Sequence, residues 1–416
     1  MSEKVPAPTA PSVAPPPPNS TTALEGGRTL PAAPTQKRAI RATEPLAPID
    51  ERRENNFDFL RFVLASLVVL SHSYALSLSH TTFRLREPLY IATRGQMDFG
   101  MFAVDLFFVI SGFLITHSWQ RSKGLGDYLK KRILRIYPGF LVVVLLGTLI
   151  VGPLGAADVH AYLQTLNLKA LYFAAQLVPP PLPATPILFV DQVFPNAING
   201  SLWSIRYEFW CYLLVAGLGL LQLFRQRNMV LALLLAVFAG YMVQLADKMK
   251  LIHLSRHLIE QEVRFIGAPG LYPRLVTYFL AGMAFYLFRD RIPRSPWLLG
   301  VSLIALAGTA LWGRGLEFAF PWCGTYVLFY IAFSRNLPLH HFAKYGDFSY
   351  GIYLYAFPIQ QLLLHAAHGS LTPLVTFVLA FPLTCLCAAL SWHLVEKPFL
   401  KKKRASSPAE KTSPQS

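Results

Sequence analysis

The feature that most constrains this chain is an apolar run that carries ionisable side chains. Residues 56–73 are apolar enough to enter a bilayer, yet they contain Asp58, Arg61 and His72. In a helix, the step from Arg61 to His72 is about three turns plus ~20°, so both side chains lie on one face, roughly 16 Å apart along the axis. Charged groups in a spanning segment are costly and usually face the interior of a helix bundle. The run therefore predicts a membrane helix with an inward-facing polar stripe.

Each of these residues also has a purely structural interpretation. Arg61 alone is compatible with an anchor at the membrane surface, and His72 alone with a polar contact between two helices. Their alignment on one helical face favours a functional role.

Composition indicates a polytopic membrane protein. Hydrophobic residues make up 53% of the 416 residues and charged residues 14%. The net charge of +16 resides in short basic clusters between apolar runs, which follows the positive-inside rule and does not indicate nucleic-acid binding. The cysteines lie inside apolar runs without zinc or disulfide spacing, so we expect small core residues and no metal site. They are Cys211, Cys323, Cys385 and Cys387.

The chain divides into a Pro-rich start, a long apolar region and a basic end. We expect residues 1–55 to be a disordered cytoplasmic tail, 56–400 a membrane-embedded domain and 401–416 a disordered tail. The basic clusters place both ends of the chain in the cytoplasm. The expected fold is an all-α, polytopic bundle of about ten transmembrane helices. The apolar segments are 59–78, 99–119, 136–151, 201–223, 229–245, 272–288, 297–312, 318–333, 348–367 and 371–394.

Three titratable groups are expected at one depth in this bundle. At ~1.5 Å per residue, His72, Asp105 and Glu208 all lie about 20 Å from the cytoplasmic surface. An imidazole beside a carboxylate, away from bulk water, is oriented for general-base catalysis. We therefore expect a reaction centre formed by these three residues. The alternative is a structural polar cluster that fixes helix register.

The cytoplasmic end of the bundle predicts a different kind of site. Arg132 and Arg135 share a helix face through their i, i+3 spacing, and guanidinium groups suit phosphate oxygens. Together with Arg61 at a similar depth, they predict a site for a phosphate-rich ligand. The alternative is that these arginines serve only as topology signals.

Six stretches, in order, resemble acyltransferase family 3, the integral membrane proteins that O-acylate bacterial surface and extracellular carbohydrates. The resemblance covers about residues 56–401. The stretches are Asp58-Phe-Leu-Arg61 through Ser71-His72, Val104-Asp105 through Ser111-Gly112, Arg132-Ile-Leu-Arg135 with Tyr137-Pro138, Asn199-Gly200-Ser201-Leu-Trp203-Ser204 with Glu208, Phe348-Ser349-Tyr350-Gly351 through Tyr353 and Tyr355, and Val395-Glu396-Lys397-Pro398-Phe399.

The resemblance implies a donor and an acceptor on opposite sides of the bacterial cytoplasmic (inner) membrane. The donor is acyl-CoA, usually acetyl-CoA, and the acceptor is a hydroxyl of an exopolysaccharide, a lipopolysaccharide or a glycolipid. By position, Arg61 and His72 form the essential pair, and Arg132 and Arg135 contact the CoA phosphates. We expect His72, oriented by Asp105 or Glu208, to deprotonate the sugar hydroxyl. A covalent acyl intermediate is the alternative to direct transfer, and we expect Ser111 to have a packing role.

The chain departs from the family pattern next to Glu208. Where many members have Leu-Pro or a similar pair, this chain has Ile205-Arg206-Tyr207, and Arg206 is expected to pair with Glu208 or with an acidic substrate. Residues expected to bind substrate are Trp203, Ser204, Arg206 and Tyr353. Two external loops, one with the Pro-rich stretch 179–195 and one with Arg256 and Arg264, are candidates for acceptor selection.

Two other classes of function compete with the enzyme. A transporter or flippase would use Arg61 and His72 as a proton or anion path. A scaffolding membrane protein would use the Pro-rich tail to bind partners, but it leaves the polar residues inside the bundle unexplained.

Overall fold

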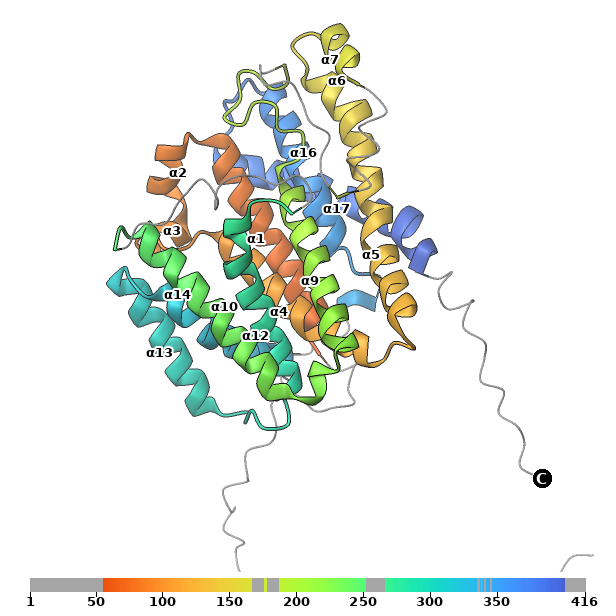
Figure 1. The fold of residues 1–416 in the computed structure, drawn as a ribbon. Coiled ribbons are helices and arrows are strands. Elements are labelled where there is room, and N and C mark those ends of the chain that lie inside the picture. The colour runs from red at the N-terminus through yellow and green to blue at the C-terminus, as the bar shows by residue number, and fades with distance from the viewer. Residues whose placement is uncertain are drawn as a thin grey trace, which may run out of the picture. The chain divides into compact units, whose positions relative to one another are not determined.

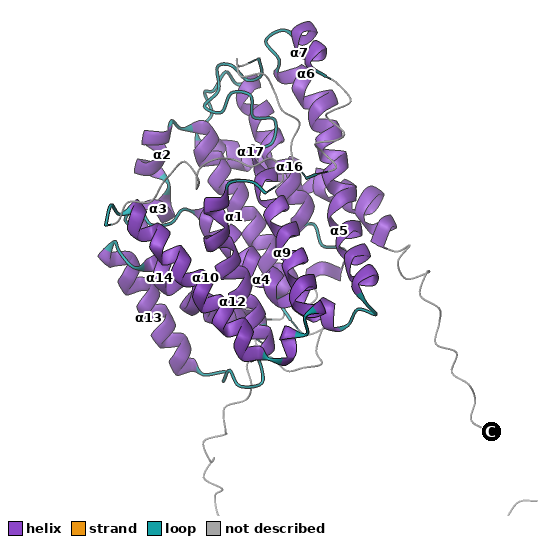
Figure 2. Cartoon of the chain, viewed as in Figure 1, coloured by secondary structure: helices purple, strands orange, loops and turns teal. Residues whose placement is uncertain are grey.

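The computed structural model describes residues 55–166, 176–177, 187–251, 266–334, 337, 339, 342–344 and 346–400. Within these ranges the chain is helical and contains no β-strand, which confirms the expected all-α class for this part of the protein (Figure 2). Residues 1–54 and 401–416, Arg256, Arg264 and residues 179–186 of the Pro-rich stretch lie outside the described residues.

Each of the ten apolar segments coincides with helix (Figure 1). Five helical stretches are long and apolar enough to cross a membrane: Phe57–Ser77, Phe99–Gln120, Leu125–Gly155, Arg227–Lys248 and Pro373–Leu400. The helices of the bundle are α1 (Phe57–Ser77), α4 (Phe99–Gln120), α5 (Leu125–Leu146), α9 (Trp203–Leu220), α10 (Arg227–Lys248), α12 (Tyr272–Leu287), α13 (Pro296–Trp312), α14 (Leu316–Ala319), α15 (Thr325–Ala332), α16 (Ser349–Ala366) and α17 (Pro373–Ser391).

The third apolar segment begins earlier than expected. Helix α5 begins at Leu125 and continues through the π-helix η1 (Gly147–Val151) into α6 (Gly152–Gly155). Its first turns are stabilised by the i, i+4 ion pair between Asp127 and Lys131, at 2.5 Å. The basic cluster at 130–135 therefore lies on a helix that faces the bundle.

Close packing of α4 against α12 fixes the centre of the bundle. A Cβ atom on Gly112 would lie 1.9 Å from the Phe279 carbonyl oxygen, and one on Gly282 would lie 1.9 Å from the Val109 carbonyl oxygen. Glycine at both positions lets the two backbones touch, which is the usual way that membrane helices approach closely. Helix α4 also contacts α1 and α9 (Figure 1).

The lipid-facing side is clearest at α13. Ser302 is its one buried residue, whereas Trp297, Ile304 and Trp312 are 76%, 73% and 81% exposed. Large apolar side chains exposed along a whole helix are unfavourable in water and suit a hydrocarbon environment. The chain is that of a membrane protein.

Short helices connect α1 to α4, where the sequence predicted none. They are α2 (His80–Arg86) and α3 (Pro88–Ala92). The carboxylate of Glu87 is buried and accepts hydrogen bonds from the backbone N–H groups of Tyr90 and Phe99, so it caps α3 and holds the start of α4.

A separate hydrophobic cluster lies beyond η1. It consists of Val151, Tyr162, Leu188 and Phe189. Tyr162 belongs to the short helix α7 (Val159–Thr165) and donates a hydrogen bond to the Thr148 carbonyl. Gly152 and Gly155 provide space for the Tyr162 and Phe189 rings. Helix α7 ends at Thr165, and residues 167–175 lie outside the described residues.

Candidate active site

A cavity of about 640 Å³ lies among α1, α4, α5, α9 and α16. This volume falls within the range of roughly 300–1,000 Å³ that is typical of small-molecule sites. Its walls include Ser111 of α4, Glu208 of α9 and Tyr353 of α16. Five of the six signature stretches contribute residues to this lining, and the predicted catalytic residue Glu208 is among them.

One end of the cavity is strongly basic. The starts of α1 and α5 meet the ends of α4 and α12 there. We call this end the basic mouth, defined by the six lysine and arginine residues that line the cavity: Arg61, Arg121, Lys131, Arg132, Arg135 and Arg289. The carboxylates in the lining are Asp58 and Glu208. The three arginines of the expected phosphate site, Arg61, Arg132 and Arg135, thus line one cavity, together with three cations that were not assigned to that site.

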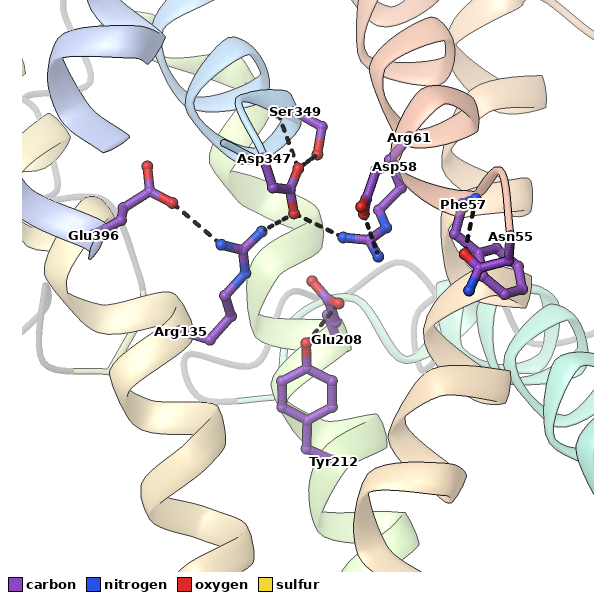
Figure 3. A network of polar contacts seen from close by, with 10 residues as sticks. All are labelled: Asn55, Phe57, Asp58, Arg61, Arg135, Glu208, Tyr212, Asp347, Ser349 and Glu396. Carbon is purple, nitrogen blue, oxygen red and sulfur yellow. Dashed lines mark hydrogen bonds and ion pairs between the residues drawn. The ribbon is translucent and has the colours of Figure 1, made fainter. Parts of the chain in front are cut away.

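Two of the expected donor-binding arginines are bound to one carboxylate. Asp347 Oδ2 accepts from Arg61 Nη1 at 2.7 Å and from Arg135 Nη2 at 2.5 Å. Its Oδ1 accepts from the Ser349 hydroxyl. Figure 3 shows this carboxylate between the two guanidinium groups, with Asp58 on the far side of Arg61. Asp347 precedes α16, so it ties α1 and α5 to the start of that helix.

The charge on Asp347 is stable. Burial raises its pKa, but the neighbouring guanidinium groups of Arg135 and Arg61 and the Ser349 hydrogen bonds lower it to about 2. The carboxylate is therefore ionised throughout the physiological pH range, and it neutralises part of the basic mouth.

A second carboxylate holds Arg135. Glu396 Oε2 lies 3.4 Å from Arg135 Nη1, and its Oε1 accepts from Ser391 at 3.2 Å. Glu396 is 1% exposed and belongs to the π-helix η7 (Trp392–Glu396), which continues α17. The C-terminal signature therefore packs its glutamate against the second arginine of the Arg-x-x-Arg motif.

Glu208 lies inside the cavity within a hydrogen-bonded group. Its Oε1 accepts from the Ser111 hydroxyl at 3.0 Å. The same oxygen accepts from the Tyr212 hydroxyl at 2.6 Å, as Figure 3 shows. Ser111, expected to have a packing role, is thus a polar wall residue beside a carboxylate.

The residues expected to bind substrate separate into two groups. Ser204 and Tyr353 line the cavity, and their hydroxyl oxygens are 2.6 Å apart. Trp203 and Arg206 are absent from the cavity lining, and both contact Tyr207, the tryptophan through its ring and Arg206 through its guanidinium group at 5.5 Å. Arg206 and Glu208 are two residues apart on α9, about 200° around the helix, so their side chains point to nearly opposite faces, and Glu208 contacts Ser111 and Tyr212.

His72 lies outside the cavity lining. Its ring packs edge-on against Phe357 of α16, with 5.3 Å between the ring centroids. Phe357 is one turn beyond the cavity residue Tyr353. Within the described part of the chain, Nδ1 of His72 is buried and has no hydrogen-bond partner, so it is available as a proton acceptor.

Asp105 faces a different neighbour from the one that depth predicted. Its Oδ2 accepts from Arg274 Nη2 of α12 at 2.9 Å, and the Asp105 side chain is 1% exposed. The expectation that Asp105 orients His72 is therefore corrected. Depth along a helix fixes height but not direction, and the glycine contact between α4 and α12 turns Asp105 toward α12. Similarly, Glu208 contacts Ser111 and Tyr212, so neither carboxylate is seen to orient His72.

Sequence reasoning missed Asp347, Arg274, Arg121 and Arg289. Asp347 stands next to the Ser349-Tyr350 signature, so its position beside a quoted motif was an available signal. Within the described ranges, no group of His, Cys, Asp and Glu residues is arranged to hold a metal ion.

The fold and the cavity define a helical membrane protein with a polar interior site that is open at a basic end. Its sequence matches the model of an acyltransferase domain over residues 54–393, and the chain belongs to that family, acyltransferase family 3. The protein is therefore an acyltransferase, and the transporter and scaffold alternatives lose their support.

Three curated relatives match over most of their length. An O-acetyl transferase of Shigella phage Sf6 is 30% identical, and the match covers 84% of this chain and 96% of the relative. Nodulation protein 10 of Rhizobium leguminosarum bv. viciae is 27% identical over 83% of this chain and 93% of its own. The exopolysaccharide production protein ExoZ of Rhizobium meliloti is 26% identical over 75% and 93%. No solved structure matches the chain.

Proposed function

We propose that the protein is a membrane O-acetyltransferase of the bacterial inner membrane, which moves an acetyl group from cytosolic acetyl-CoA to a hydroxyl of an exported or surface glycan. The observation that carries this proposal is the cavity, which joins a basic mouth to a polar interior inside a membrane bundle. The net positive charge of the mouth suits the phosphates of the donor. The names of the relatives, an O-acetyl transferase and an exopolysaccharide production protein, support the acetyl group and the glycan acceptor.

The basic mouth faces the cytoplasm in this proposal. Its lining combines the starts of α1, α5 and α16 with the ends of α4 and α12. Helices that alternate in direction across ten spans have this arrangement, and the positive-inside rule places the arginine-rich end inside. The proposal retains ten spans, cytoplasmic tails at residues 1–55 and 401–416, and a membrane domain at 56–400.

The reaction is a transfer of an acyl group from sulfur to oxygen. The sugar hydroxyl oxygen attacks the thioester carbonyl carbon, a C–O bond forms and the C–S bond breaks, and the CoA thiol leaves. A base must take the hydroxyl proton and a proton must reach the departing sulfur. We assign the base role to His72, because its Nδ1 is buried and unpartnered in the described residues and its ring is one aromatic side chain away from Tyr353.

The acetyl group approaches His72 from the cavity, and the sugar approaches from the opposite membrane surface. Phe357, one turn after Tyr353 on α16, packs against His72, so the proposal requires the thioester arm to pass this ring to reach the histidine. Glu208 has a positioning role here: it fixes the Ser111 and Tyr212 hydroxyls along the path of the thioester arm. Ser204 and Tyr353 are the proposed wall contacts near the transferred group.

The test is acetyl transfer in inverted membrane vesicles that contain the host's glycans, with radiolabelled acetyl-CoA added outside. The variants are His72→Ala and, as a matched control, His80→Ala at an exposed position of α2. We expect label on glycan with wild type and His80→Ala, and a loss of at least about 100-fold with His72→Ala. Equal labelling by His72→Ala would exclude His72 as the base, and no labelling by wild type would exclude acetyl-CoA as the donor under these conditions.

A further inference from the structure

The six cations of the basic mouth differ in their partners. Arg61, Lys131 and Arg135 each have carboxylate partners: Arg61 contacts Asp58 and Asp347, Lys131 contacts Asp127, and Arg135 contacts Asp347 and Glu396. Arg121, Arg132 and Arg289 form no ion pair with any described carboxylate. The excess positive charge of the mouth therefore resides on these three arginines.

The three unpaired arginines lie around the last turns of α4. Arg132 Nη2 donates to Ser118 at 3.3 Å, and Arg121 follows that serine by one turn, at the C-cap of α4. Arg289 stacks on the Tyr286 ring at 4.3 Å. The Tyr286 hydroxyl donates to Gln120 of α4 at 2.8 Å, so Arg289 is tied to the same turn.

Arg132 and Arg135 are one turn apart on α5, yet they have different surroundings. Arg132 contacts a neutral hydroxyl and the face of the Tyr212 ring at 5.7 Å, and its buried Nε has no hydrogen-bond partner in the described residues. Arg135 has a carboxylate on each side and stacks near the Tyr350 and Trp392 rings. A guanidinium whose charge is already balanced by two carboxylates attracts a phosphate less strongly than one with only neutral neighbours.

We propose that Arg132, with Arg121 and Arg289, forms the subsite for the phosphate groups of the donor, and that Arg135 is a framework residue that joins α5 to Asp347 and to η7. This inference rests on the proposed function and deepens it by dividing the two arginines of one motif between binding and architecture. Arg61, also held by Asp347, belongs to the framework. The phosphates thus bind on the α4 and α12 side of the mouth, away from the Asp347 carboxylate.

The first experiment measures acetyl-CoA binding to purified protein in lipid nanodiscs, with Arg132→Gln and Arg135→Gln as a matched pair. Loss of a charge-assisted hydrogen bond to phosphate is expected to raise the Kd of Arg132→Gln by about 10- to 100-fold. Arg121→Gln is expected to raise the Kd by about 3- to 10-fold, because the Arg121 side chain is exposed and solvent screens its charge. Arg289→Gln is expected to raise the Kd by a similar factor. Arg135→Gln is expected to lower thermal stability while its Kd stays within about twofold of wild type.

If Arg135→Gln is too unstable to purify, a second variant allows the Kd to be measured without Arg135. Arg135→Gln leaves the buried Glu396 carboxylate without its cationic partner. The double variant Arg135→Gln/Glu396→Gln also removes this carboxylate, so its thermal stability is expected to be partly restored relative to Arg135→Gln. Arginine footprinting of wild type requires no variant: acetyl-CoA is expected to protect Arg121, Arg132 and Arg289 from phenylglyoxal and to leave the labelling of Arg135 unchanged.

The outcomes separate the two levels of the proposal. A wild type that binds no acetyl-CoA would overturn the donor, and with it this subsite. A wild type that binds acetyl-CoA while Arg132→Gln binds equally well, or while Arg135 is the protected residue, would overturn the subsite and leave the donor intact.

Discussion

Replacing Asp347 by asparagine removes one charge and nearly no volume from the junction of three helices. Arg61 Nη1 and Arg135 Nη2 lie 2.7 Å and 2.5 Å from the same Asp347 Oδ2, so the two nitrogens are at most about 5 Å apart. At an effective dielectric constant of about 20, two positive charges at this separation repel by about 3 kcal/mol. The pKa gives a similar magnitude, because a fall from 3.8 to about 2 corresponds to roughly 2 kcal/mol of stability. We therefore expect Asp347→Asn to lose about 2–3 kcal/mol.

The assay is thermal unfolding of the purified protein in detergent, followed by loss of the monodisperse peak in size-exclusion chromatography. The expected fall in Tm is roughly 4 °C or more. The control is Asp290→Asn, which breaks an ion pair with Arg227 at 3.0 Å whose side chains are 48% and 35% exposed. Exposed ion pairs contribute little to stability, so the Tm of this variant is expected to equal that of the wild type. A Tm of Asp347→Asn within about 1 °C of wild type would refute the reasoning.

Three further outcomes follow from the same structure. Because the folded-state pKa of Asp347 is lowered, the stability that its charge contributes is present above about pH 4 and is lost as the pH falls toward 2. We expect the wild type to lose about 2 kcal/mol of stability over this range and Asp347→Asn to lose less. The measurement is the Tm of both proteins as a function of pH. Gly282→Ala places a methyl group 1.9 Å from a backbone oxygen and is expected to lower the free energy of unfolding by at least about 3 kcal/mol. Gly308 has open space around it, so Gly308→Ala is expected to leave the Tm unchanged or to raise it. Equal Tm values for the two variants would contradict the close contact between α4 and α12. Glu208→Gln keeps the side-chain shape but loses the charged acceptor, and is expected to lower the acetyl-transfer rate about 10- to 100-fold with acetyl-CoA binding retained; an unchanged rate would remove Glu208 from the site.

The sequence predicts the helices well because segment length and hydropathy are local properties. Phe99–Gln120 and Tyr272–Leu287, for example, begin at the expected residues. Helix α5 was placed eleven residues too late, because its first three turns are polar on the side that faces the cavity. An apolar window does not detect a helix that enters a basic site.

The site was predictable only in part. Motif spacing predicted that Arg61, Arg132 and Arg135 lie together, and the cavity lining includes all three, with Glu208. The partner of Asp105 was missed, because counting residues gives only the depth of a side chain in the membrane. The direction in which that side chain points around its helix depends on which helices pack together. Asp347 was missed for another reason: it pairs with Arg61 across 286 residues of sequence, and no local pattern reports such a contact.

The small cluster of Val151, Tyr162, Leu188 and Phe189 holds the described ends of the connection that we expect to select the acceptor. It has its own interior, built on the end of α5–η1–α6, and it shares no residue with the cavity lining. Segments between Tyr162 and Leu188 can therefore be exchanged between family members as a cassette, provided that Gly152 and Gly155 remain to seat the two aromatic rings. Such chimaeras would vary what the protein presents on that side of the bundle while leaving the donor end untouched.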